Sequence, residues 1–165
     1  MEGNIDVVSN NPRRQILIAT DGSETANEAA DFAMEMFGCS GAKVYAVYVI
    51  DTTPYRSIPL DKIWSKETLD EFEKAGQEAT SYVEKIGKAA GVEVETRVLR
   101  GNPAEKIMSF AEDNNIDMIV VGSLGKGGYE RIVLGSVSEK VVRHAKVPVL
   151  VVRERHKSEK KLIQA

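Results

Sequence analysis

The chain has one cysteine and two histidines among its 165 residues, and this scarcity limits the chemistry that it can carry. Cys39 alone can form no intrachain disulfide and no metal site built on several thiolates. His144 lies near the end of a predicted helix and His156 lies in a polar tail, both far from the glycine-rich loop described below. We therefore expect neither a Ser-His-Asp triad nor a histidine-based metal cluster.

Long apolar runs and a large net charge are also missing. No run approaches the roughly 20 residues needed to span a bilayer, and the polar, acidic N-terminus does not resemble a secretory signal. The formal net charge of -3 gives no overall reason to expect a nucleic acid or an anionic membrane as partner, although a local basic patch stays open. With 42% hydrophobic residues, we expect a single-domain cytoplasmic protein.

What the chain does contain is a regular alternation of apolar runs and helical patterns. Strands are predicted at 15–19, 43–50, 92–99, 116–121 and 147–152. Helices are predicted at about 26–37, at 66–90, from Pro103 onward behind an Asn102 cap, and at 136–145. Strict alternation predicts an α/β fold with a doubly wound parallel sheet and helices on both faces. Only 92–99 alternates apolar and charged residues, which predicts an exposed edge strand.

Closely spaced glycines follow the fourth predicted strand. Two residues separate Gly122 from Gly125, nine separate Gly125 from Gly135, and Ser136 comes next. A strand that ends in glycines and then feeds a helix presents bare backbone N–H groups, which is how proteins hold phosphate. The pattern therefore predicts nucleotide binding.

Two familiar phosphate motifs do not fit this chain. The dinucleotide fingerprint needs several glycines in the first strand-to-helix turn, where only Gly22 is present. The P-loop needs Ser or Thr after Gly-Lys, but Gly125-Lys126 is followed by Gly127. In open parallel sheets the ligand crevice forms at the carboxyl ends of the strands where the winding reverses, so the loops after the first and fourth strands are expected to converge.

The spacing Gly-x2-Gly-x9-Gly-Ser resembles the nucleotide-binding signature of the universal stress protein family. Further blocks resemble that family in the same order, at 20–24, 49–51, 101–105, 117–123 and 147–152. The resemblance covers residues 13–153, which leaves a polar extension at 1–12 and a polar tail at 154–165 that we expect to be disordered. It implies a five-stranded parallel sheet in the order 3-2-1-4-5, of the adenine-nucleotide α-hydrolase-like type, and a homodimer.

The same resemblance implies a bound adenine nucleotide: ATP, with ADP or AMP left open. Its site residues would be Ala19, Thr20, Asp21, Val49, Val121, Gly122, Ser123, Gly125, Gly135, Ser136, Val137 and Ser138. Asp21 would face the ribose or a phosphate-bound Mg, and the Val49 backbone would contact adenine. Many family members carry His or Arg where this chain has Leu124, which removes one side-chain contact and leaves the backbone site intact.

In the phosphate half of this implied site, Gly122 and Gly125 would admit the ribose and phosphates. Gly135, Ser136 and the next two N–H groups would hold the phosphate chain at the start of the fourth helix.

Several of these residues also have plain structural interpretations. Ser136 and Asp21 are each suited to cap a helix, with Glu139 at capping-box spacing from Ser136. Lys126 and Arg131 are either phosphate counter-charges or solvated loop cations. Gly127 and its neighbour Gly128 are either a mobile phosphate cover or ordinary turn residues.

The crossover from 51 to about 65 is the one long irregular connection. It contains Pro54, Tyr55, Pro59 and Trp64 and leaves the carboxyl end of the second strand, where ligands of such sheets lie. It is either a lid or an ordinary loop whose Trp64 packs on the core.

The last strand suggests the oligomeric state. From Val147 to Val152 the chain is a flat apolar edge, protected only by Pro148, and pairing with a second copy across a two-fold axis would cover it. The alternative is a monomer whose basic tail folds over this edge.

We expect an ATP-binding, dimeric, nucleotide-dependent switch or sensor in stress response, with an unknown protein partner. Two alternatives stay open: a slow ATP hydrolase or phosphoryl-transfer enzyme that uses Asp21 and Mg, and a dimeric scaffold independent of nucleotide. No general base is evident, which favours the switch.

Overall fold

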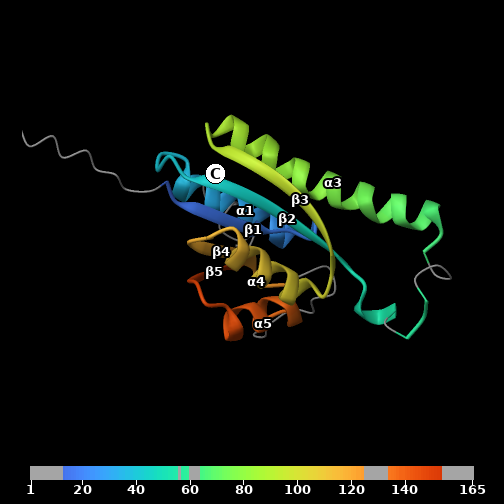
Figure 1. Ribbon diagram of the computed structural model, residues 1–165. Helices are drawn as coiled ribbons and strands as arrows, with labels where there is room; N and C mark the ends of the chain where they lie inside the picture. Colours follow the sequence, from blue (N-terminus) through green and yellow to red (C-terminus); the bar gives the residue numbers. More distant parts are fainter. Residues whose placement is uncertain (1–12, 56, 60–63, 125–133, 154–165) are drawn as a thin grey trace, which may run out of the picture.

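A computed structural model of the chain describes residues 13–55, 57–59, 64–124 and 134–153. The extension, the tail and the loop residues Gly125, Lys126 and Arg131 lie outside the described residues. Five parallel strands form one sheet in the order β3-β2-β1-β4-β5, which confirms the predicted fold and strand order (Figure 1). The strands are β1 (Gln15–Ala19), β2 (Lys43–Asp51), β3 (Glu93–Gly101), β4 (Met118–Gly122) and β5 (Val149–Val152).

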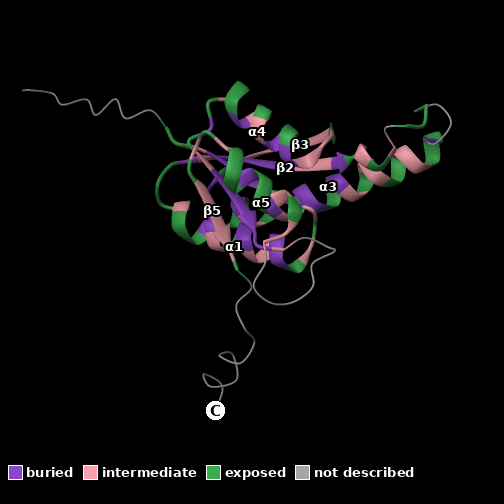
Figure 2. Cartoon of the chain, turned by 90° about the horizontal axis from the view of Figure 1, so that it is seen from below, coloured by how far each residue is buried: buried purple, intermediate pink, exposed green. Residues whose placement is uncertain are grey.

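Helices cover both faces of the sheet, so the core has two halves. The helices are α1 (Glu24–Phe37), η1 (Thr53–Tyr55, a 3-10 turn), α3 (Lys66–Ala89), α4 (Pro103–Asp113) and α5 (Ser136–His144). One cluster of buried side chains lies under α1 and α3, and the other lies under α4 and α5. Figure 2 shows the buried residues along the strands, between these helical layers.

The central strand β1 explains why the sheet requires cover on both sides. Successive strand side chains point to opposite faces, and Ile16, Leu17 and Ile18 are all at most 1% exposed. Burial of each such side chain contributes about 1.5–3 kcal/mol. The sequence of β1 thus stabilises both core halves at once.

Local signals fix where three of the helices begin. The Ser23 hydroxyl accepts a hydrogen bond from the Ala26 N–H at 3.2 Å, and Ser65 does the same for Thr68 at 3.2 Å. The Asn102 side chain accepts from the Glu105 N–H at 3.2 Å ahead of Pro103, which confirms the predicted cap.

The fourth helix begins differently from the expectation. Gly135 occupies the N-cap position of α5 and Ser136 is the first helical residue, so the expected capping box of Ser136 and Glu139 is wrong. A glycine has no side chain with which to cap. Among the described residues no side chain caps this helix.

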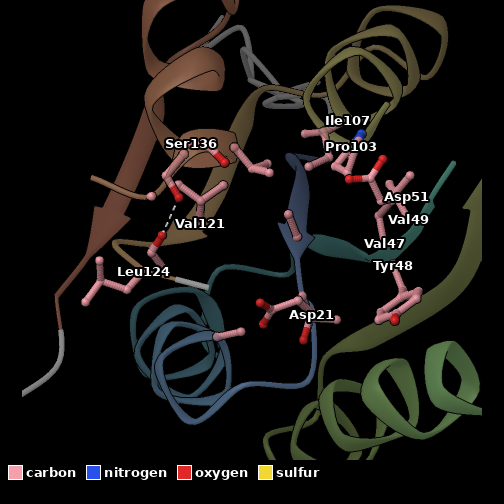
Figure 3. A pocket seen from close by; sticks show the side chains of 17 residues that line it. Asp21, Val47, Tyr48, Val49, Asp51, Pro103, Ile107, Val121, Leu124 and Ser136 are labelled. Atoms are coloured by element: carbon pink, nitrogen blue, oxygen red, sulfur yellow. Dashed lines mark hydrogen bonds between the residues drawn. The ribbon is translucent and has the colours of Figure 1, made fainter. Parts of the chain in front are cut away.

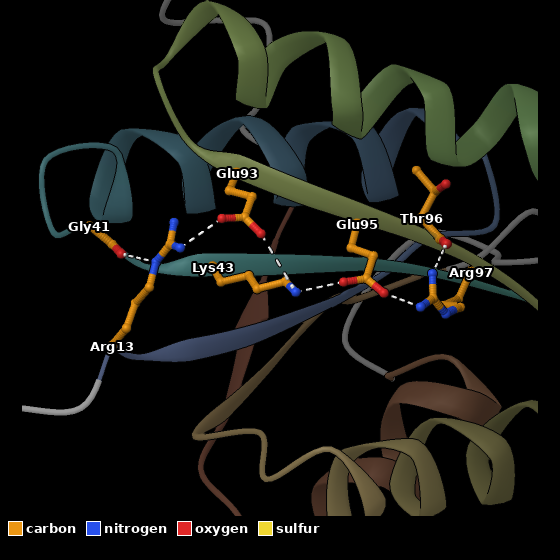
Figure 4. Close-up of polar contacts among 7 residues, drawn as sticks. All are labelled: Arg13, Gly41, Lys43, Glu93, Glu95, Thr96 and Arg97. Atoms are coloured by element: carbon orange, nitrogen blue, oxygen red, sulfur yellow. Dashed lines mark hydrogen bonds and ion pairs between the residues drawn. The ribbon is translucent and has the colours of Figure 1, made fainter.

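Charged residues line the amino ends of β2 and β3, on the face that carries α4 (Figure 4). Lys43 pairs with Glu95 at 2.6 Å and with Glu93 at 3.6 Å, Arg13 reaches Glu93 at 2.7 Å, and Arg97 pairs with Glu95. The hydrogen bond from Arg13 lowers the pKa of Glu93, and that from Lys43 lowers the pKa of Glu95. The hydrogen bond to Glu95 raises the pKa of Lys43. These five residues form the charge network discussed below.

The crossover after β2 packs on itself and on α3. Trp64 is buried and makes edge-to-face contacts with Tyr55 and Phe72, both at 5.2 Å between ring centroids. The Trp64 ring therefore joins a small aromatic cluster outside both core halves. None of the described helices combines the length and the apolar character that a membrane span requires.

Candidate functional site

A cleft of about 640 Å³ opens at the carboxyl ends of β1, β2 and β4, beneath the first turns of α4 and α5 (Figure 3). β1 lies between β2 and β4, so this is the point where the winding of the sheet reverses. The loops after the first and fourth strands do converge here, as the sequence predicted.

Most of the residues singled out from the sequence line this cleft. They are Ala19, Thr20, Asp21, Val49, Val121, Gly122, Gly135, Ser136, Val137 and Ser138. Ser123 is buried and is not part of the lining, and Gly125 lies outside the described residues.

The loop after β1 is held by its own side chains. The Thr20 hydroxyl accepts from the Gly22 N–H at 3.1 Å, and an Asp21 carboxylate oxygen accepts from the Ser23 N–H at 2.9 Å. Gly22 has a positive φ of 76°, which favours glycine. Because Ser23 caps α1, Asp21 is not the helix cap, and its side chain lies at the cleft (Figure 3).

β2 extends past β1 and offers its backbone to the cleft. The last β1–β2 pair is Ala19–Val47, and the Thr20 N–H donates to the Val47 carbonyl at 2.9 Å. Polar groups of alternate residues face the same side of a strand, so those of Val49 also face the β1 side, where that strand has already ended. Val49 thus presents a donor and an acceptor side by side.

A small set of hydrogen bonds ties the end of β4 to the start of α5. The buried Ser138 hydroxyl donates to the Gly122 carbonyl at 2.6 Å, and the Gly135 N–H donates to the Ser123 carbonyl at 2.8 Å. The Ser123 N–H in turn donates to Val152 of β5 at 2.8 Å. Ser123 and Ser138 therefore position the part of the cleft that lies at the N-terminus of α5.

Gly122 has a packing role beside its place in the lining. A Cβ at this position would lie 3.1 Å from the carbonyl oxygen and the Cγ2 of Thr25 in α1. The close approach of α1 to β4 therefore favours glycine at this position whether or not a ligand is bound, since any side chain would require Thr25 to shift.

The N-terminus of α5 is suited to bind an anion in the cleft. The first N–H groups of a helix have no intrahelical partner, and they carry the positive end of the helix dipole. Ser136, Val137 and Ser138 supply these groups in α5, and all three line the cleft. With glycine at the N-cap, no side chain of that residue blocks the approach to them.

Apart from Leu124, six lining residues were not among the site residues predicted from the sequence: Ala26, Val47, Tyr48, Asp51, Pro103 and Ile107. Burial, with a smaller effect of the Asp21 charge, raises the pKa of Tyr48. The Tyr48 ring packs against Gly76 of α3, where a Cβ would lie 2.8 Å from its Cδ1 atom. Pro103 and Ile107 stand on the first turns of α4, and Asp51 ends β2.

Among the described residues, no group of three or more acidic, His or Cys side chains is placed to hold a metal ion. Asp21 and Asp51 are nevertheless two carboxylates on one cleft. A phosphate-bound Mg needs only one or two carboxylates, because phosphate oxygens and water complete its shell. Asp21, on the loop after β1, is therefore the carboxylate that would hold a nucleotide-borne Mg, whereas Asp51 lies at the end of β2 beside Pro103 (Figure 3).

Comparison with known proteins gives a consistent result. The sequence profile of the universal stress protein family matches residues 12–153. A universal stress protein of Methanocaldococcus jannaschii is 44% identical over 142 residues, covering 86% of this chain and 82% of that protein. The solved universal stress protein of Lactobacillus plantarum superimposes with a TM-score of 0.72 at 26% identity, covering 87% of this chain and 100% of that one.

Two similar structures were solved with adenine nucleotides. One is a universal stress protein in complex with cAMP, with a TM-score of 0.61, 25% identity and coverage of 86% of this chain and 97% of that one. The other is a universal stress protein from Archaeoglobus fulgidus in complex with dAMP, with a TM-score of 0.60, 25% identity and coverage of 85% and 97%.

Proposed function

The chain belongs to the universal stress protein family, and from this premise we propose that it binds ATP in the cleft at the carboxyl ends of β1, β2 and β4. The cleft volume of about 640 Å³ is in the range of small-molecule sites, about 300–1,000 Å³. Binding of cAMP and dAMP by similar proteins supports an adenine nucleotide as the ligand class.

The observation that carries this proposal is the bare N-terminus of α5. Ser136, Val137 and Ser138 offer adjacent N–H groups to the cleft behind a glycine N-cap. Phosphates are bound at such helix ends by N–H donation and by the dipole together. We assign the phosphate chain to this end, with Gly125 as a further contact predicted from the sequence.

The base belongs at the opposite end of the cleft. The Val49 N–H and carbonyl match N1 and the 6-amino group of adenine, which are an acceptor and a donor. Apolar side chains of Val47, Pro103 and Ile107 line the same end and give the ring a surface on which to pack. Ala19 and Thr20 complete the wall on the β1 side.

Between the two ends, Asp21 is the residue for the ribose or for a phosphate-bound Mg. A Mg ion bound with ATP would neutralise phosphate charge, and a carboxylate at this place would hold one of its ligand positions. The Asp21 carboxylate is oriented by the Ser23 N–H at 2.9 Å, so it is held before a nucleotide arrives.

We propose further that the protein is a homodimer and that ATP acts as a switch signal rather than as a substrate. β5 is the edge strand of the sheet, and all four of its residues are only half-buried. Pairing of β5 with a second copy would cover them. Ser123 links β5 to α5 through backbone hydrogen bonds, which connects the nucleotide site to this edge.

The test is a calorimetric titration of the full chain with ATP and Mg. We expect saturable binding, and we expect Gly135→Val to weaken it at least tenfold, since a branched side chain would stand over the first N–H groups of α5. Ala89→Val adds bulk on an exposed face of α3 and should leave the affinity unchanged.

Equal affinity in the Gly135→Val variant would remove the α5 end from the site. If the wild-type chain purified without nucleotide and ATP left its melting temperature unchanged, the nucleotide-independent scaffold would replace the present proposal.

A further inference from the structure

We infer that Asp51 selects the base of the nucleotide, by accepting a hydrogen bond from the 6-amino group of adenine. This inference rests on the proposed function and extends it to a residue outside the family signature. It follows from the polarity of β2, from the position of Asp51 in the cleft and from the way its carboxylate is held.

The direction of β2 decides how a base lies against it. Within each strand residue the carbonyl lies on the C-terminal side of the N–H. An adenine that accepts from the Val49 N–H at N1 therefore places its 6-amino group by the Val49 carbonyl, toward the C-terminal end of β2. One hydrogen of the 6-amino group then donates to the Val49 carbonyl. The second hydrogen points further along the strand, toward Asp51, the next residue of β2 that lines the cleft.

The Asp51 side chain is on the correct face. Side chains alternate along a strand, so Val47, Val49 and Asp51 share the face that carries α4. All three line the cleft, and Figure 3 shows the Asp51 carboxylate near Pro103, beyond Val49. Residues two apart on a strand are separated by about 6.6 Å, a distance that the amino group and the aspartate side chain together can bridge.

One of the two carboxylate oxygens is engaged and the other is available. Oδ1 accepts from the Thr53 N–H at 2.9 Å and from the Thr53 hydroxyl at 2.6 Å. Within the described part of the chain, no hydrogen bond or ion pair reaches Oδ2. The contacts to Thr53 fix the side chain, so that an acceptor with no donor of its own faces the base.

This arrangement discriminates by repulsion as well as by attraction. Hypoxanthine and guanine carry a carbonyl oxygen at position 6, which would face both the Val49 carbonyl and the Asp51 carboxylate. Asp51 is exposed and Val49 is half-buried in the open cleft, so the discrimination comes from placing a third acceptor oxygen against two others, where adenine would donate two hydrogen bonds.

The experiment compares the affinities of ATP and ITP for the wild-type chain and for Asp51→Asn. The two nucleotides share the ribose and triphosphate, so the ratio of their dissociation constants isolates the base. Asparagine keeps an Oδ1 acceptor for Thr53, and it replaces the other oxygen with an NH2 donor. We expect the preference for ATP to fall by about tenfold, the scale of one charge-assisted hydrogen bond.

Asp113→Asn is the matched control, because it removes the same charge from an exposed position at the far end of α4. Its ATP/ITP ratio should equal that of the wild type. An unchanged ratio in Asp51→Asn, with ATP still bound, would overturn the inference and leave the proposed function standing. Failure of the wild type to bind ATP would overturn both.

Discussion

Single residues at the cleft perform structural and ligand-facing roles together. Ser138 is at once a donor of an N–H group at the start of α5 and the residue whose buried hydroxyl holds the Gly122 carbonyl at 2.6 Å. Ser136, two residues earlier, is exposed and is not the helix cap. The two serines of one helix turn can therefore be separated by their effect on stability.

Ser138→Ala should lower the free energy of unfolding by about 1–3 kcal/mol, because it leaves the Gly122 carbonyl without its side-chain donor in a buried place. Urea unfolding followed by circular dichroism measures this change. Ser136→Ala is the control and should change stability by less than about 0.5 kcal/mol. Equal losses in both variants would mean that the Ser138 bond does not brace the loop.

Sequence alone gave the chemistry of these residues but not their exact roles. The glycine spacing identified the α5 terminus, yet the cap proved to be Gly135 instead of Ser136, since capping depends on where the backbone turns. Gly122 was expected to leave room for a ligand, and its lack of a side chain also leaves room for Thr25 of α1. Asp51 and Pro103 lie in the blocks 49–51 and 101–105 that resemble the family, but the sequence did not name them as site residues, since their meeting at the cleft depends on how α4 packs over β2.

At the scale of elements, the apolar runs predicted the existence and order of the five strands, but they misplaced the first residues of two of them. Ile116 and Val147 were assigned to strands, whereas β4 begins at Met118 and β5 at Val149. Ile116 is buried, but its N–H donates to Ala111 at the end of α4 at 2.9 Å. Hydrophobicity indicates burial, and strand pairing additionally needs a neighbouring backbone in register.

The charge network on β2 and β3 predicts a pH dependence. Folding lowers the pKa values of Glu93 and Glu95 below the ordinary 4.5, so their stabilising effect is complete above pH 4.5. It is lost as the pH falls through the folded values. Lys43→Met should flatten the decline of unfolding free energy below pH 4.5, measured by urea titrations between pH 3 and about 7.

Exposed Lys85 gives the control, because Lys85→Met removes a like charge outside the network. Added salt should weaken the wild-type effect by screening. A Lys43→Met curve parallel to that of the wild type would show that these pairs do not couple to folding.

For the whole molecule, β5 is the edge at which a second copy can join. The Pro148 carbonyl accepts from Ile119 of β4 and the Val152 carbonyl from Ser123 just after β4, so the polar groups of Val149 and Val151 face outward. Proline is tolerated on an edge strand where the lost N–H faces away from the sheet.

Val151→Pro should therefore leave the circular dichroism spectrum intact and halve the mass measured by sedimentation, if β5 forms the proposed dimer interface. Val142→Ala, which trims an exposed side chain of α5, serves as the control and should keep the wild-type mass. A dimer that survives Val151→Pro would place the interface on another face of the molecule.

The strand order has one more consequence. β1, β2 and β3 come from the first part of the chain, β4 and β5 come from the last part, and the seam between them is the β1–β4 pair. Each part contributes one wall of the cleft, so a bound nucleotide would contact both parts and hold them together across that seam. Two separately expressed fragments divided between α4 and β4 would each lack a complete binding surface, and added ligand would favour their reassembly.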